Sequence, residues 1–167
     1  RTNEAVRDAV AKQVSFGIDS VSDGDMSKVS YTFYVRHRLS NIDPAQPPGV
    51  EPPREGANQD ILDHPDFAER VARERSGWAL SFGRPWVVGP VEYENHDPLK
   101  RDIANLKEAI DDHSPGEAFM TSASPGVLSK FVPDEFYKNE DAYIEAMANA
   151  MKIEYEAIHA AGLILQI

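Results

Sequence analysis

The chain has 167 residues, of which 28 are Asp or Glu and 17 are Lys or Arg, so its formal net charge is −11. This length suits one domain of ordinary size, and a hydrophobic content of 41% argues against a disordered chain. An acidic surface repels phosphate backbones, which argues against a nucleic-acid partner. The absence of Cys excludes a disulfide framework, and also a thiolate metal site built by this chain alone.

The apolar runs and the two ends of the sequence lead to further expectations. No apolar run approaches the roughly 20 residues that span a bilayer, and residues 1–6 lack the apolar core of a signal peptide. We therefore expect a soluble, cytoplasmic protein without a membrane partner. Position 1 is Arg rather than Met, and residues 163–167 are typical of a buried strand although chain ends usually lie exposed. These two features predict a fragment of a longer protein.

The first half of the chain predicts a helix, a short strand and an irregular excursion. Apolar side chains recur at helical spacing over residues 4–16, and Gly17 occupies a position at which helices often end. Residues 18–22 predict a strand, and a second helix is expected over 29–39. Prolines and glycines crowd residues 43–56, which we interpret as an inserted surface loop or, alternatively, as a lid over a site.

The second half of the chain alternates helices and strands. Helices are expected over residues 66–75, from Pro98 to a break at Pro115, and over 140–161. Strands are expected at residues 86–89, 117–121 and 163–167. This alternation predicts an α/β fold, in which the four expected strands form a parallel sheet and are neighbours in sequence order.

Polar residues follow the expected strands, at the edge where parallel α/β folds place their ligands. Asp23 and Asp25 flank a glycine after the first strand, where they could bind an ammonium group or a hard cation, or simply turn the chain. Ser122 and Ser124 follow residues 117–121 and could hydrogen-bond a ligand, or Ser124 could cap the next helix. The five histidines show no metal-binding spacing, so no metal ligand is expected in this chain.

Four segments carry a resemblance to a known family: residues 10–25, 86–90, 119–128 and 153–167. In order and spacing they resemble the cobalamin-independent methionine synthases, especially the short single-barrel members, some of which look like epoxyalkane:coenzyme M transferases. The resemblance implies a (β/α)8 TIM barrel. Residues 1–167 would form one partial barrel domain with about four parallel strands and their helices, interrupted by the proline-rich loop at 43–56.

The resemblance also implies chemistry and site residues. The family transfers a methyl or small alkyl group to a zinc-bound thiolate, and its zinc ligands lie on later strands, so zinc is expected to be held outside this chain. Asp25 matches a carboxylate, usually Glu, that binds the amino group of homocysteine, and Asp23 lies beside it. Ser122 and Ser124 match a Thr-Gly-Pro strand end, Phe131 lies near an aromatic residue that stacks on folate, and Gln166 begins a Gln-Ile-Asp stretch. No catalytic residue is expected within this segment.

Three functions remain open at this point. The first is part of a zinc-dependent methyltransferase that methylates homocysteine to methionine from methyltetrahydrofolate. The second is a coenzyme M transferase or lyase-like enzyme that acts on an epoxide. The third is a non-catalytic half-barrel that binds a small molecule or self-associates. The expected partners are a small-molecule thiol and a methyl or alkyl donor, with a homo-oligomer as a further possibility.

Overall fold

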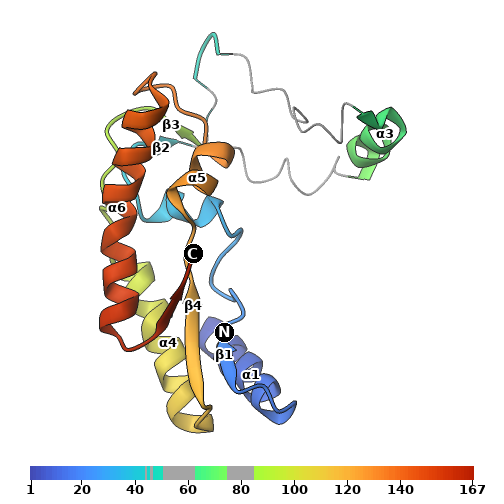
Figure 1. Ribbon diagram of the computed structural model, residues 1–167, viewed down its shortest axis with the longest axis vertical. Helices are drawn as coiled ribbons and strands as arrows, with labels where there is room; N and C mark the ends of the chain where they lie inside the picture. Colours follow the sequence, from blue (N-terminus) through green and yellow to red (C-terminus); the bar gives the residue numbers. More distant parts are fainter. Residues whose placement is uncertain (44, 46, 51–62, 75–84) are drawn as a thin grey trace.

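A computed structural model of the protein describes residues 1–43, 45, 47–50, 63–74 and 85–167. The elements in chain order are α1 (Thr2–Ser15), β1 (Ser20–Ser22), the 3-10 helix η1 (Phe33–His37), β2 (Ile42–Asp43), α3 (Pro65–Glu74), β3 (Trp86–Val87), α4 (Asp97–His113), β4 (Glu117–Thr121), α5 (Pro125–Phe131), α6 (Glu140–Ala160) and β5 (Ile164–Gln166). Helices and strands alternate along the chain (Figure 1), so the fold is mixed α/β, as the sequence pattern predicts.

The central sheet has three parallel strands in the order β1-β4-β5. Ser22 lies opposite Phe119 on β4, and Thr121 at the end of β4 lies opposite Gln166 on β5. The chain passes through α4 between β1 and β4, and through α5 and α6 between β4 and β5. In Figure 1 the strands run upward, so the loops that follow them share the end of the molecule that carries η1 and α5.

One face of this sheet packs on the helices. Val21 of β1 and Ala118 and Met120 of β4 are buried in one apolar cluster with side chains from α1, α4 and α6. α1 packs along α4, and α5 packs on α6. The alternate positions Phe119 and Thr121 are only half-buried, because successive side chains of a strand point to opposite faces. The core therefore lies on the helical side, and the opposite face is less covered within the described residues.

The helices α1 and α6 end in the same way. Gly17 and Gly162 adopt left-handed φ values of 76° and 79°. In each case the amide of the next residue donates back to the helix, from Ile18 to the Gln13 carbonyl and from Leu163 to the Ile158 carbonyl. This is the Schellman arrangement, in which glycine avoids the steric cost of a Cβ. It turns each helix directly into the strand that follows.

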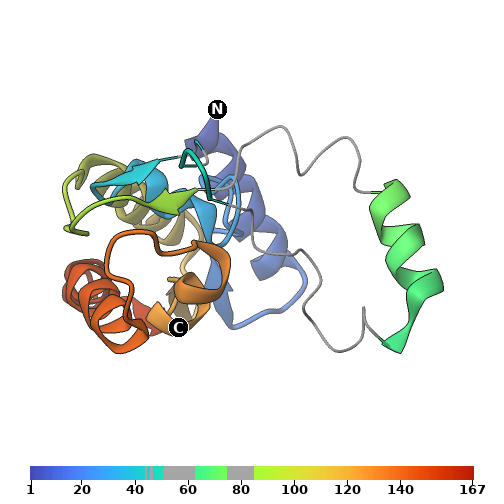
Figure 2. The same cartoon turned by 90° about the horizontal axis from the view of Figure 1, so that it is seen from above.

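The expectation of four neighbouring parallel strands is wrong for residues 86–89. Trp86–Val87 forms β3, which pairs antiparallel with Ile42–Asp43 in a separate two-stranded sheet, while β1 pairs directly with β4. The same antiparallel pairing continues at Leu39 and Tyr93. The two segments that flank residues 44–84 thus leave and re-enter the fold side by side, as Figure 2 shows, and this arrangement satisfies their backbone groups locally.

Two element boundaries also differ from expectation. The helix expected over residues 29–39 is reduced to the 3-10 helix Phe33–His37, because the Ser30 hydroxyl accepts the amides of Thr32 and Phe33 and so competes with helical hydrogen bonds. The first strand begins at Ser20 rather than residue 18, because Ile18 completes the end of α1. β2 was not anticipated from the sequence.

The inserted region is described only in part. Of the proline-rich segment expected at residues 43–56, the structure describes Asp43, Ala45 and residues 47–50, and the remainder lies outside the described residues. α3 confirms the helix expected near residues 66–75. Among the described residues, no helix is both long and apolar enough to cross a membrane. The three-stranded parallel sheet does not by itself show a closed barrel.

Candidate functional site

Lys28 ties the loop after β1 to the end of β4. Its ammonium group donates to the backbone carbonyl and the Oγ1 atom of Thr121, both at 2.7 Å, and to Oδ1 of Asp25 at 2.8 Å. The Thr121 hydroxyl in turn donates to Asp25 Oδ1 at 2.6 Å. Because an ammonium group has three donors, Lys28 is fully satisfied, and its side chain is buried. Asp25 is thereby fixed beside the carboxyl ends of β1 and β4.

Asp25 presents a charged and partly accessible carboxylate. Its side chain is 41% exposed, and its Oδ2 atom makes no hydrogen bond with the described part of the chain. Partial burial opposes the charged form, but hydrogen bonds from Lys28 and Thr121, together with the charge of Lys28, outweigh it and lower the pKa of Asp25. The site therefore offers one free anionic oxygen to a ligand.

Asp23 has the opposite character. It is 1% exposed, its Oδ1 atom accepts the amide of Asp25 at 3.1 Å, and its Oδ2 atom has no hydrogen-bond partner among the described residues. Burial raises the pKa of Asp23, although the charge of Lys28 acts in the other direction. The hydrogen bond is that of an Asx turn, which shapes the loop that presents Asp25. Asp23 itself does not reach the surface.

Ser122 joins a buried polar cluster that we call the Glu154 cluster, made up of Glu154, Ser122, Tyr34, Tyr93, Arg38 and Asp102. Oε1 of Glu154 accepts from the hydroxyls of Ser122 and Tyr34, both at 2.8 Å. Oε2 accepts from Arg38 at 2.7 Å and from the Tyr93 hydroxyl at 2.8 Å. Four charge-assisted bonds thus satisfy a carboxylate that is 1% exposed, which makes its burial tolerable.

Arg38 connects this carboxylate to a second one. Its other terminal nitrogen donates to Asp102 of α4 at 2.5 Å, and its guanidinium lies 4.6 Å from the centroid of the Tyr34 ring. Burial opposes the charge of Arg38, but the carboxylates of Glu154 and Asp102, together with Tyr93, outweigh it and raise the pKa of Arg38. The arginine therefore stays charged and links η1 to both α4 and α6.

The tyrosines of the Glu154 cluster act as hydrogen-bond donors rather than as acids. Burial raises the pKa of Tyr34 and of Tyr93, and the negative charge of Glu154 raises both further. The Tyr34 hydroxyl also accepts the amide of Ala123 at 3.2 Å. Tyr155 of α6 donates to the carbonyl of the same residue at 2.8 Å. The loop after β4 is consequently held to both η1 and α6.

The remaining site residues expected from the sequence occupy different environments. Ser124 caps α5, because its side chain accepts the amide of Val127 at 3.2 Å. Phe131, at the end of α5, is 40% exposed and packs edge-to-face with Tyr31 at 5.7 Å between ring centroids. Gln166 ends β5 with an exposed side chain, and its carbonyl accepts the Ser122 amide at 2.8 Å. Phe131 and Gln166 are therefore exposed and Asp25 is partly exposed, whereas Asp23 and Ser122 are buried.

Sequence reasoning missed five of the residues that hold this end of the sheet together: Lys28, Tyr34, Arg38, Asp102 and Glu154. A signal was present for two of them. Glu154 lies three residues after Met151 and four before Ile158, on the apolar stripe of its helix. Asp102 likewise lies three residues after Leu99 and four before Leu106, among the buried residues of α4. A carboxylate on a buried helical stripe predicts a buried cation opposite it.

The zinc implied by the family resemblance needs several ligand side chains held close together. The chain has no Cys, and no group of three or more His, Asp or Glu side chains within the described residues is placed to hold a metal ion. Zinc sites in proteins use three or four such ligands. The described residues therefore do not fit a zinc site.

Comparison with solved structures finds this fold in larger proteins, among them two methionine synthases. The B12-independent methionine synthase from Shewanella sp. W3-18-1, solved in complex with selenomethionine, is 21% identical with a TM-score of 0.68. The putative vitamin-B12 independent methionine synthase from Listeria monocytogenes is 19% identical with a TM-score of 0.63. Both similarities cover 99% of this chain and 40% of the other chain. No protein-family model and no curated protein matches the sequence. At these identities the likeness is one of fold, and the chain spans 40% of the length of either synthase.

Proposed function

We propose that the chain is part of an enzyme that transfers a methyl or another small alkyl group to a thiol, as in the methylation of homocysteine from methyltetrahydrofolate. Two kinds of observation support this proposal. The fold of almost the whole chain is that of methionine synthases. Polar residues also gather beside the carboxyl ends of β1 and β4, where parallel α/β folds bind ligands.

The observation that carries the proposal is the geometry of Asp25. Its Oδ1 atom is held by Lys28 and Thr121, while Oδ2 is free within the described residues and the side chain is partly exposed. A fixed carboxylate with a lowered pKa and an open oxygen is suited to accept a hydrogen bond from an ammonium group. The amino group of homocysteine supplies such a donor.

A second candidate function is favoured by the ion pair between Asp25 and Lys28. Because Lys28 neutralises Asp25, the pair as a whole attracts an ammonium group less strongly than an isolated carboxylate would. A thiol without an amino group, such as coenzyme M, would then be the acceptor, and an epoxide would be the alkyl donor. The two candidates share thiol alkylation and differ in what Asp25 contacts.

Both candidates need more than this chain. In the proposal, the zinc of the family is held by residues outside these 167, and Phe131 and Gln166 contribute exposed side chains to the region that receives the donor or the thiol. The partners are a small thiol and a methyl or alkyl donor. We propose the complete protein, rather than this segment, as the active species.

Incubation of the complete protein with defined pairs of substrates tests the proposal. Homocysteine with methyltetrahydrofolate and coenzyme M with a short epoxide are the two pairs, and mass spectrometry of the thioether product is the readout. We expect a thioether from one pair and none from the same mixture without the protein. Failure to form a thioether from either pair, in a protein that folds, would contradict both candidates.

A further inference from the structure

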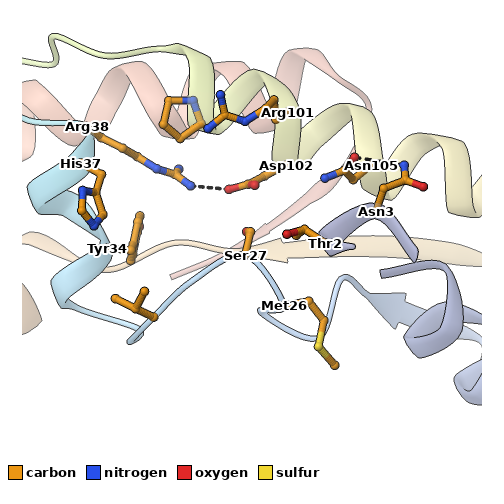
Figure 3. A pocket seen from close by; sticks show the side chains of 12 residues that line it. Thr2, Asn3, Met26, Ser27, Tyr34, His37, Arg38, Arg101, Asp102 and Asn105 are labelled. Atoms are coloured by element: carbon orange, nitrogen blue, oxygen red, sulfur yellow. Dashed lines mark hydrogen bonds and ion pairs between the residues drawn. The ribbon is translucent and has the colours of Figure 1, made fainter. Parts of the chain in front are cut away.

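A cavity of about 400 Å³ lies between α1, the loop after β1, η1 and α4. Figure 3 shows it from close by, with Arg38 reaching from η1 toward Asp102 on α4. The cavity touches one edge of the Glu154 cluster, but Asp25, Thr121 and Glu154 do not line it. Its volume lies within the range of about 300–1,000 Å³ that is usual for small-molecule sites.

The lining of this cavity carries an excess of basic side chains in an acidic protein. Arg38, Arg101 and His37 line it, and Asp102 is the one acidic residue of its lining. The charge of Arg38 is already shared between Asp102 and Glu154. Arg101 is exposed and makes no hydrogen bond or ion pair with the part of the chain that the structure describes. The uncompensated cation of the lining is therefore Arg101.

A second, independent observation comes from Ser27. Its side chain lines the cavity, and its Oγ atom is buried without a hydrogen-bond partner among the described residues. Figure 3 shows the Ser27 side chain turned toward α4, the helix that carries Arg101 and Asp102. Buried hydroxyl groups are nearly always hydrogen-bonded, because an unpaired one loses its hydration without compensation. A cavity lined by both an unpaired hydroxyl and an unpaired cation is suited to an acceptor that bears negative charge.

We propose that this cavity binds a small organic or inorganic anion bearing a carboxylate or phosphate group. Arg101 pairs with the anion, and the Ser27 hydroxyl donates a hydrogen bond to it. Arg38, locked by its two carboxylate partners, forms the rigid inner wall and offers its remaining N–H groups. This site lies beyond the proposed thiol chemistry, since it uses none of the residues that hold Asp25.

Isothermal titration of the purified protein at low ionic strength tests the proposal. The probes are succinate, inorganic phosphate and the neutral analogue succinamide. We expect one-to-one binding of succinate or phosphate, weakened by added salt, and no binding of succinamide. Tighter binding of succinate identifies a carboxylate ligand, and tighter binding of phosphate identifies a phosphate ligand. Absence of stoichiometric binding by either anion would overturn the proposal.

Two variants and a matched control locate the binding to this cavity. Arg101→Gln should raise the Kd of the bound anion about tenfold, and Ser27→Ala should raise it several-fold, because both remove a hydrogen bond to a charged acceptor. Lys100→Gln removes the same charge from the adjacent, exposed position of α4, which does not line the cavity, and should leave Kd unchanged. Equal losses for Lys100→Gln and Arg101→Gln would show diffuse surface attraction instead of a site. Because Asp25 is held by Lys28 and Thr121, neither of which lines the cavity, such a failure would leave the thiol-transfer proposal intact.

Discussion

Arg38 and Glu154 lie 116 residues apart in the sequence and form a buried ion pair, with 2.7 Å between Nη1 and Oε2. Arg38 directly follows η1 in the excursion after β1, and Glu154 belongs to α6. Both side chains are almost fully buried, so the pair does not contact a ligand directly. It joins the excursion after β1 to the helix before β5, and so helps to shape the end of the sheet at which Asp25 lies.

The first prediction concerns the centre of this cluster. Glu154→Gln removes the charge that faces Arg38 and replaces an acceptor oxygen by a donor, which leaves hydroxyl donors without partners. Loss of one partner from a buried ion pair costs about 3–5 kcal/mol, so the free energy of unfolding should fall by about that amount. Urea denaturation followed by circular dichroism measures it.

Glu156→Gln is the matched control for this change. Glu156 lies on the same helix and pairs at 3.6 Å with Lys152, but both side chains are largely exposed. Exposed pairs contribute at most about 1 kcal/mol, so the control should have little effect. Similar, small losses for the two variants would show that the Glu154 cluster does not stabilise the fold.

The second prediction concerns Asp23, whose Oδ2 atom is buried and unpaired. Asp23→Asn keeps the oxygen that accepts the Asp25 amide but removes the desolvated charge, so it should raise the free energy of unfolding at pH 7 by about 1 kcal/mol. The exposed Asp19→Asn should change it by less than about 0.5 kcal/mol. A clear loss of stability in Asp23→Asn would show that the charge of Asp23 is needed.

The same carboxyl group predicts a pH dependence. Because burial raises the pKa of folded Asp23 above its ordinary value of 3.8, the folded state binds this proton more tightly than the unfolded state. Its contribution to stability is therefore fully present below the unfolded pKa and is lost as the pH rises through the folded pKa. As the pH rises from the unfolded to the folded pKa of Asp23, the free energy of unfolding of wild type should therefore fall further below that of Asp23→Asn. Unfolding curves at several pH values measure it, and a constant gap would contradict the assignment.

The third prediction concerns Lys28. Lys28→Met removes the ammonium group that hydrogen-bonds Asp25, so the pKa of Asp25 should rise toward its ordinary value or above it. In the wild type, Asp25 stabilises the fold above its unfolded pKa, and this contribution is lost as the pH falls through its lowered folded pKa. Carbon-13 NMR titration of the Asp25 carboxyl group measures the change, with the exposed Lys12→Met as control. An unchanged pKa in Lys28→Met would show that Lys28 does not set the charge of Asp25.

The fourth prediction separates a structural serine from a ligand-binding one. Ser124→Ala removes the hydrogen bond to the Val127 amide at the start of α5 and should cost about 1 kcal/mol of stability. Ser129→Ala, which removes an exposed bond to the Gly126 carbonyl, should cost less. Unchanged stability in Ser124→Ala, together with a loss of substrate binding in the complete protein, would assign Ser124 to the site instead.

The ends of the long helices could be predicted from the sequence because they depend on local chemistry. Gly17 and Gly162 stop α1 and α6 through hydrogen bonds to carbonyls within five residues, so a short window contains the whole signal. The same holds for Ser124, which caps α5 through a residue three positions away. Apolar spacing also located β4 at Glu117–Thr121.

Features that depend on distant contacts could not be predicted in this way. Strands β2 and β3 have two residues each, too few to show an alternating pattern, and they exist because Ile42 meets Val87 across an inserted region. The position of Lys28 depends on Thr121, 93 residues away. Asp25 is predicted from its place after a strand and from the family resemblance, whereas its ion pair and its free oxygen are visible only in three dimensions.

The measurement that tests the central claim most directly is kcat/KM of the complete protein for homocysteine and for 4-mercaptobutanoate, the same thiol without its amino group. Both are measured with wild type and with Asp25→Asn. If Asp25 binds the substrate ammonium group, the variant should lose on the order of 1.5–3 kcal/mol of transition-state stabilisation with homocysteine. This corresponds to a roughly 10- to 150-fold fall in kcat/KM, and the value for 4-mercaptobutanoate should stay nearly constant. Equal losses for both thiols, or no loss for either, would contradict the proposed role of Asp25.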